Sequence, residues 1–117
     1  MSTTISGLYG VDKVVPDTEV QQVGVNQTWQ DVKASRTSGV QETNNTGKPI
    51  KITVDALNTG SSNVDIALQI DGVEITKIYY NTSAVGVRAN ISEIIPSGST
   101  YTVTVAIGAV DKWFELR

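Results

Sequence analysis

The clearest feature of this sequence is an alternation of apolar and polar residues in its middle third. Apolar residues stand at every second position over 50–56 and again over 64–70. Successive side chains of a strand point to opposite faces, so a period of two gives each strand one dry face and one solvated face. The pattern predicts strands at residues 50–57 and 64–70 that belong to an antiparallel β-sandwich.

The dipeptide Asp71-Gly72 follows the second of these strands and predicts a two-residue hairpin turn of type I′. The next strand, 73–80, changes its apolar face midway, which indicates a bulge near Thr76 or Lys77. Further short strands are predicted, with turn residues between them, at 27–33, 39–43, 85–91, 101–107 and 112–117. About eight short strands and no helical period predict an all-β protein, a jelly-roll-like antiparallel β-sandwich.

Residues 1–25 have a different pattern from the rest of the chain. Their apolar residues are spread among Ser, Thr, Gly and Pro without a period of 2 or 3.6. We interpret this segment as an irregular N-terminal arm that docks either on its own domain or on another protein. The sequence is thereby divided into an arm, 1–25, and a sandwich domain, 26–117.

Composition excludes several classes of function. The chain has 117 residues, enough for one domain, with 39% hydrophobic and 18% charged residues. It has no apolar run near the ~20 residues that cross a bilayer and no signal-like N-terminus, so we expect no membrane insertion and folding in a cytoplasm. Nine scattered Lys and Arg residues against a net charge of −3 argue against nucleic-acid binding. The absence of Cys and His removes disulfides, thiolate and Ser-His catalysis and the usual transition-metal ligands.

The remaining candidate chemistry rests on oxygen atoms. Paired acids could hydrolyse a glycoside, but nothing in the order of the acids singles out a pair, and we interpret them as surface acids: Asp55, Asp65, Asp71, Glu74, Glu93 and Glu115. A loop with calcium-type ligands lacks the spacing of a defined calcium site: Asp55, Asn58, Ser61, Asn63 and Asp65. Four Asn-X-Ser/Thr triplets are interpreted as polar turns and edges, at Asn26, Asn44, Asn81 and Asn90. We expect no catalytic residue, metal or cofactor.

The end of the sequence carries large apolar side chains where chains usually fray. Trp113, Phe114 and Leu116 would leave an apolar patch exposed if this segment were free. We therefore expect these three residues in the core or in a subunit interface, and a chain that does not tolerate their removal. Trp113 could alternatively stack on a sugar ring.

Several short motifs together resemble a C-terminal β-sandwich domain of tail fibres and related virion surface proteins of tailed bacteriophages. They cover 26–117 in this order: Gln27-Thr28-Trp29-Gln30-Asp31-Val32, Ala34-Ser35-Arg36, Asn45-Thr46-Gly47-Lys48-Pro49-Ile50, Ile70-Asp71-Gly72-Val73, Ile95-Pro96-Ser97-Gly98-Ser99-Thr100-Tyr101 and Trp113-Phe114-Glu115-Leu116-Arg117. The resemblance implies a non-enzymatic β-sandwich tip, commonly part of a trimer, in a virion assembled in the bacterial cytoplasm. Family members usually end a long fibre, whereas only residues 1–25 precede the domain here, so a capsid decoration protein fits as well.

Three functions therefore remain. The first is a non-enzymatic virion structural protein that forms a homo-oligomer and contacts other virion proteins through residues 1–25. The resemblance implies that this oligomer is a trimer. The second is a carbohydrate-binding module for a host surface glycan, with Tyr79, Tyr80 and Trp29 as candidate stacking residues. Cross-strand aromatic contacts in the core would explain these three residues equally well. The third, a glycan-cleaving enzyme, is the least favoured because no acid pair stands out.

Overall fold

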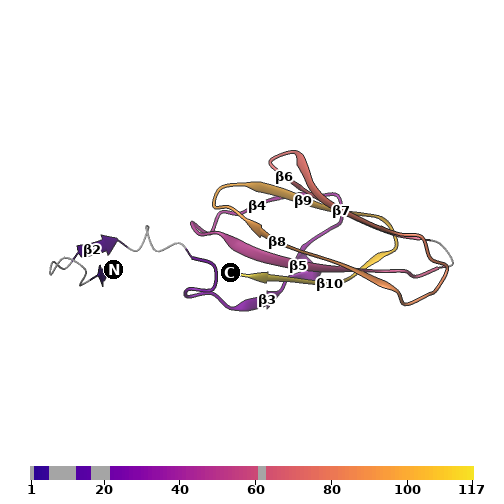
Figure 1. Cartoon of the computed structure of the whole chain (residues 1–117), viewed down its shortest axis with the longest axis horizontal. Coiled ribbons are helices and arrows are strands. Elements are labelled where there is room, and N and C mark those ends of the chain that lie inside the picture. Colours follow the sequence, from indigo (N-terminus) through magenta and orange to yellow (C-terminus); the bar gives the residue numbers. More distant parts are fainter. Residues whose placement is uncertain (1, 6–12, 17–21, 61–62) are drawn as a thin grey trace.

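The computed structural model describes residues 2–5, 13–16, 22–60 and 63–117. Within them, eight strands form two four-stranded antiparallel sheets that pack face to face (Figure 1). The first sheet contains, in spatial order, β3 (Trp29–Asp31), β10 (Ala109–Leu116), β5 (Ile50–Leu57) and β8 (Arg88–Ile95). The second contains β4 (Gln41–Thr43), β9 (Thr100–Ile107), β6 (Val64–Ile70) and β7 (Val73–Tyr80).

The order of the strands is that of a jelly roll. The chain passes from β3 to β4 and from β4 to β5 by changing sheets, stays in the second sheet only for the β6–β7 hairpin, and then changes sheets at each step to β10. Strands distant in sequence therefore become neighbours, as in the pairing of β3 with β10. The all-β, jelly-roll-like sandwich predicted from the alternation is confirmed.

The start of the chain departs from the expected irregular arm. β1 (Ser2–Ile5) and β2 (Lys13–Pro16) pair antiparallel in a separate two-stranded sheet. The rest of segment 1–21 lies outside the described residues. Nearer the sandwich, Gln27 donates a side-chain hydrogen bond to the Pro49 carbonyl at 2.9 Å, which ties residues 22–28 to the start of β5.

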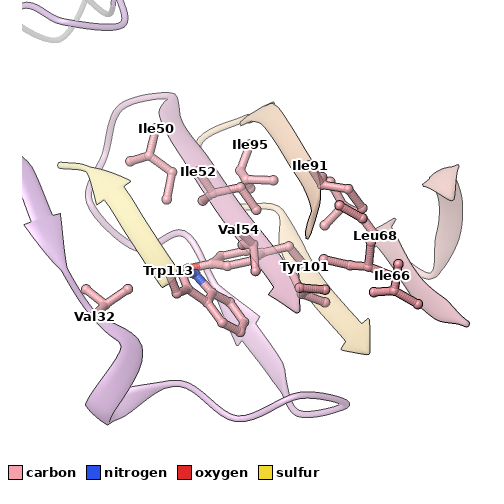
Figure 2. Close-up of a cluster of buried hydrophobic side chains, with 14 residues drawn as sticks. Val32, Ile50, Ile52, Val54, Ile66, Leu68, Ile91, Ile95, Tyr101 and Trp113 are labelled. Carbon is pink, nitrogen blue, oxygen red and sulfur yellow. The ribbon is translucent and has the colours of Figure 1, made fainter. Parts of the chain in front are cut away.

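The core consists of the apolar positions predicted by the alternation. Ile50, Ile52, Val54 and Ala56 of β5 have no exposed surface, and their outward neighbours are only half-buried. β6 repeats the pattern, and Figure 2 shows these side chains gathered between the sheets with Trp113 and Tyr101 among them. Each fully buried side chain of this size contributes about 1.5–3 kcal/mol, so this cluster is the main source of stability.

The turn between β6 and β7 has the predicted type. Asp71 and Gly72 have φ values of 51° and 79°, and a type I′ turn requires positive φ at both central positions. The Asp71 carboxylate also accepts hydrogen bonds from the Thr100 N–H and the Ser99 hydroxyl, both at 2.9 Å. This side chain therefore fixes the hairpin to the beginning of β9.

The predicted bulge in β7 is present, one residue earlier than expected. Thr76 pairs with Leu68 and Glu74 with Gln69, so Ile75 is the extra residue. The bulge restores the apolar face, because Thr76 and Ile78 beyond it are half-buried while Ile75 itself is 49% exposed.

Five predicted strands have other limits in the structure: 27–33 is 29–31, 39–43 is 41–43, 85–91 is 88–95, 101–107 is 100–107 and 112–117 is 109–116. At two of them, side chains hold the neighbouring backbone in loops. β8 begins at Arg88 and not at Val85, because Asn58 binds the preceding loop. The Asn58 side chain donates to the carbonyls of Thr82 and Ala84, at 3.3 and 3.1 Å. β3 ends at Asp31 because the chain turns into a single 3₁₀ turn, Lys33–Ser35, that leads toward the second sheet.

Candidate functional site

The most unusual group in the described residues is a carboxylate buried between the sheets. Glu115 has no exposed surface, and both of its oxygens are occupied. Arg36 donates to both, from Nε to Oε2 at 3.1 Å and from Nη2 to Oε1 at 2.9 Å. Tyr101 and Trp113 add hydrogen bonds to Oε2 at 2.9 and 3.1 Å, and Arg117 Nε lies 3.3 Å from Oε1. We call these five residues the Glu115 cluster.

Local geometry explains how these side chains meet. Trp113 and Glu115 are two residues apart on β10, so both point inward. Tyr101 points inward from β9 in the opposite sheet, and Arg36 directly follows the 3₁₀ turn between β3 and β4. The cluster therefore joins both sheets and the chain that crosses between them.

The charges of the cluster stabilise one another. The hydrogen bond with Glu115 raises the pKa of Arg36 above its usual range, although burial opposes this. Burial, followed by the charge of Glu115, raises the pKa of Tyr101 to about 12. A carboxylate that already accepts this many donors and has no exposed surface is not placed to abstract a proton from a substrate. We interpret the cluster as a structural tie.

Asn44 forms a second buried tie near the same end of the strands, where Ile50 pairs with Ile95 and Ile52 pairs with Glu115. Its Nδ2 donates to the carbonyls of Lys48, Ile95 and Pro96 at 2.7, 3.0 and 3.1 Å. Its Oδ1 accepts from the backbone N–H and the hydroxyl of Thr46 at 3.2 and 2.7 Å. Asn44 has no exposed surface, so this Asn-X-Thr triplet stabilises a turn, as predicted, and is not an acceptor for glycosylation.

Sequence reasoning missed the Glu115 cluster. Arg36 and Glu115 are 79 residues apart, and Glu115 was counted among surface acids. One signal was available, because the alternation over β10 places Glu115 on the same face as Trp113. A charged residue on the inward face of a strand needs a buried partner, and this requirement points to an arginine elsewhere in the chain.

The outer face of the first sheet presents a row of three apolar residues and one lysine. Leu116 pairs with Trp29 on one side and with Lys51 on the other, and Lys51 pairs with Ile94. We call these four residues the Trp29 row. Trp29 is 50% exposed and Ile94 51% exposed, and Leu116 is half-buried. Of the three residues expected in the core or in an interface, Trp113 lies in the core, while Leu116 and the half-buried Phe114 face outward here.

Beside the Trp29 row lies a polar ladder formed by Thr53, Asp55, Asn90 and Ser92 of β5 and β8. Asn90 Nδ2 donates to Thr53 Oγ1 at 2.9 Å and to Asp55 Oδ1 at 2.6 Å. Ser92 donates to Thr53 at 2.9 Å or to Asn90 Oδ1 at 2.9 Å. Asn90 and Ser92 are exposed, Thr53 and Asp55 are half-buried, and these groups can exchange their mutual hydrogen bonds for bonds to a ligand.

The three predicted stacking residues do not form one platform. Trp29 is on the first sheet, whereas Tyr79 and Tyr80 are on β7 in the second. Tyr79 pairs with Asp65 on the outer face and accepts a hydrogen bond from Asn63. Tyr80 pairs with the inward-facing Val64 but is 44% exposed at the sheet edge.

The loop with calcium-type ligands, which lacked the spacing of a calcium site, makes internal contacts wherever it is described. Asp55 accepts from Asn90, Asp65 lies 3.6 Å from the Lys77 ammonium, and Asn58 accepts from the Gly60 N–H at 3.0 Å. Ser61 lies outside the described residues. In the described ranges there is no group of three or more acids that could hold a metal ion, and no helix long and apolar enough to cross a membrane.

Comparisons with known proteins add little to these observations. No protein-family model matches the sequence, and no curated protein does. Among solved structures, an exo-β-1,3-galactanase from Phanerochaete chrysosporium with galactose is similar over 97% of this chain, which spans only 32% of the galactanase, with a TM-score of 0.42 and 10% identity. A family 35 carbohydrate-binding module from Clostridium thermocellum is similar over 99% of this chain and 85% of its own, with a TM-score of 0.37 and 9% identity. Likenesses this weak carry no argument about what this chain binds or does.

Proposed function

We propose that this chain is a non-enzymatic structural protein of a bacteriophage virion. In this proposal the jelly-roll domain assembles as a homo-oligomer, and residues 1–25 join it to other virion proteins. The proposal starts from the resemblance in sequence motifs to virion surface domains. In it, the sandwich domain bears load in the particle and attaches it to other surfaces. Repeated weak contacts of an oligomer raise avidity without a deep binding site.

One observation carries the proposal: the motifs of the resemblance coincide with the contacts that hold this fold. The Arg36 motif meets the last motif at Glu115. Asn44, directly before the Asn45 motif, binds the carbonyls of Ile95 and Pro96, and Asp71 binds Ser99 and Thr100. Residues that fix a scaffold are what an assembled, load-carrying domain must keep, whereas an enzyme must also keep a reactive group at its surface.

The experiment tests assembly and location separately. Light scattering on the purified protein is expected to show more than one copy per particle at micromolar concentration. An antibody against the chain is expected to label phage particles from the source strain, on the tail or on the capsid, and deletion of residues 1–25 should abolish the label while the domain stays folded. A monomeric protein that is absent from purified particles would contradict the proposal.

A second candidate function, glycan binding, is favoured by the Trp29 row and its polar neighbours. An exposed indole on the same sheet face as hydroxyl, amide and carboxylate groups, with β10 between them, offers a stacking surface and hydrogen bonds to a ligand long enough to reach both. On a glycan array, Trp29→Ala is expected to abolish binding. The matched control is Tyr79→Ala, since Tyr79 is 51% exposed on the other sheet and Trp29 is 50% exposed. An array with no bound glycan, or equal losses in both variants, contradicts this assignment.

A further inference from the structure

Exposed apolar side chains are concentrated around the β7–β8 edge of the sandwich, although Ile94 and Tyr79 lie on the outer faces of the two sheets. Among the described residues, eight large apolar side chains are exposed, and six of them lie between residues 73 and 94. These six belong to β7, to β8 and to the loop between them: Val73, Ile75, Tyr79, Tyr80, Val85 and Ile94. β7 and β8 are edge strands of the two sheets, and β8 packs across the sandwich on β6 and β7.

The opposite side of the sandwich, at β3 and β4, is covered by the chain itself. The connection 32–40 runs over it and bonds to both sheets, since the Val32 N–H donates to the Trp113 carbonyl at 2.9 Å and the Gly39 N–H to the Val103 carbonyl at 2.8 Å. The Ser38 hydroxyl accepts from the Val105 N–H at 2.8 Å. Natural sheets cover or charge their edges in this way to prevent pairing with other chains.

β7 has little of this protection. It is eight residues long and, among the described strands, pairs with β6 alone, so the backbone groups of its outer edge have no strand partner. Only Glu74 and Lys77 are charged, and the bulge at Ile75 is its one distortion. A long apolar edge strand is a template for β-pairing.

The charges of β7 suit a second copy of the same strand. Glu74 and Lys77 both face outward from the second sheet, because they pair with Gln69 and Ala67. Antiparallel pairing of two β7 strands about a twofold axis can place Glu74 of each copy opposite Lys77 of the other. The bulge permits this register, because it puts the two residues on the same face although they are an odd number of positions apart. Val73 then lies opposite Ile78 of the copy.

We propose that two copies of this chain join through β7, antiparallel and about a twofold axis, with Glu74 opposite Lys77. The inference rests on the homo-oligomer of the proposed function and names its contact surface. Each twofold contact excludes water from the exposed apolar residues of both β7 strands and satisfies their free backbone groups. The number of copies is therefore even: two, or six where a threefold contact is also present.

The first test is disruption of the apolar edge. Val73 and Ile75 are 60% and 49% exposed, so Val73→Lys/Ile75→Lys should fold normally while placing four like charges at the contact. We expect its dissociation constant to rise about 100-fold or more, since losing a central apolar contact commonly costs tenfold or more each. Val40→Lys, at 47% exposure on the covered side, is the matched control and should leave the number of copies unchanged.

The second test reads the register directly, because the chain contains no cysteine. Glu74→Cys protein mixed with Lys77→Cys protein should form a disulfide-linked pair under mild oxidation, because directly opposed residues lie about 4.5–5.5 Å apart between Cα atoms. Either variant alone should cross-link poorly, because its two thiols are offset by three residues, roughly 10 Å along the strands.

The outcomes separate this inference from the proposed function. An oligomer that survives Val73→Lys/Ile75→Lys, a stoichiometry of three, or mixed cysteine variants that fail to cross-link overturns the β7 contact and leaves the homo-oligomer standing. A wild-type protein that is monomeric overturns both. Loss of the oligomer in the double lysine variant, together with cross-linking specific to the mixture, supports the β7 contact.

Discussion

The sharpest prediction concerns Arg36, whose guanidinium neutralises a carboxylate inside the protein. The Arg36→Met variant keeps most of the apolar stem of the side chain and removes the charge. It also removes two charge-assisted hydrogen bonds to Glu115, of 2.9 and 3.1 Å. Because Glu115 has no exposed surface, water cannot replace them.

The size of the effect follows from burial. Breaking a buried ion pair by removing one partner costs about 3–5 kcal/mol of unfolding free energy. Tyr101 and Trp113 still donate to Oε2 in the variant, and Arg117 stays near Oε1, so we expect the lower end, about 3 kcal/mol. This is a large part of the roughly 5–15 kcal/mol of a typical domain.

The assay is urea unfolding followed by tryptophan fluorescence, because Trp113 is buried within the cluster. A loss of about 3 kcal/mol should lower the urea midpoint by roughly 1.5 M for a slope near 2 kcal/mol per M. The matched control is Arg88→Met. Arg88 binds Asp111 at 3.0 Å with its side chain 53% exposed, so its loss should cost under about 1 kcal/mol.

A double-mutant cycle checks the cause. Glu115→Gln removes the charge that needs a partner, so the double variant Arg36→Met/Glu115→Gln should be less destabilised than the sum of the single variants, by about 1–3 kcal/mol. If Arg36→Met costs no more than Arg88→Met, or if the two single effects simply add, the idea of a stabilising buried pair is wrong.

Three further predictions concern other residues of the fold. The pKa of Tyr101 is about 12 in the folded chain against 10.0 when exposed, so the contribution of Tyr101 to the unfolding free energy is complete below pH 10 and is lost as the pH rises to 12. In Tyr101→Phe, the decline of the unfolding free energy between pH 10 and pH 12 should therefore be smaller than in the wild type by about 2–3 kcal/mol. Gly108→Ala should cost more than about 2 kcal/mol in chemical denaturation, since its Cβ would lie 2.6 Å from the Leu57 carbonyl oxygen at a φ of 104°, whereas Gly39→Ala, with open space at φ 81°, should cost about 1 kcal/mol; equal costs would exclude the clash. Asn44→Ala should lower the unfolding free energy by about 3 kcal/mol because it leaves buried carbonyls unpaired, and the exposed Asn45→Ala should change it by under about 0.5 kcal/mol; a tolerated Asn44→Ala would contradict the role of this tie.

The parts of the fold that were predictable are those encoded by neighbouring residues. The alternation over residues 50–57, 64–70 and 73–80 predicted the limits of β5, β6 and β7, and Asp71-Gly72 predicted its turn. In each case the signal is local, because a period of two or a left-handed turn depends only on adjacent positions.

The parts that were not predictable depend on contacts between distant residues. Val85 was expected in a strand, but Asn58 holds its segment in a loop, and the residues next to Val85 give no sign of this contact. The Glu115 cluster likewise requires a partner 79 residues away. The outward position of Phe114 and Leu116 followed from the alternation of β10 but was obscured by the assumption that large apolar residues near the end of the chain are all buried.

The place of β10 between β3 and β5 also constrains how the protein is made. Among the described strands, β3 pairs with β10 alone, so a ribosome must have synthesised nearly the whole domain before the first sheet can close. Until then, β5 can pair with β8 alone, and its edge toward β10 stays open to chaperones or to other chains. Sheets built from such long-range pairs fold slowly, so newly made chains are expected to be the aggregation-prone stage in the life of this protein.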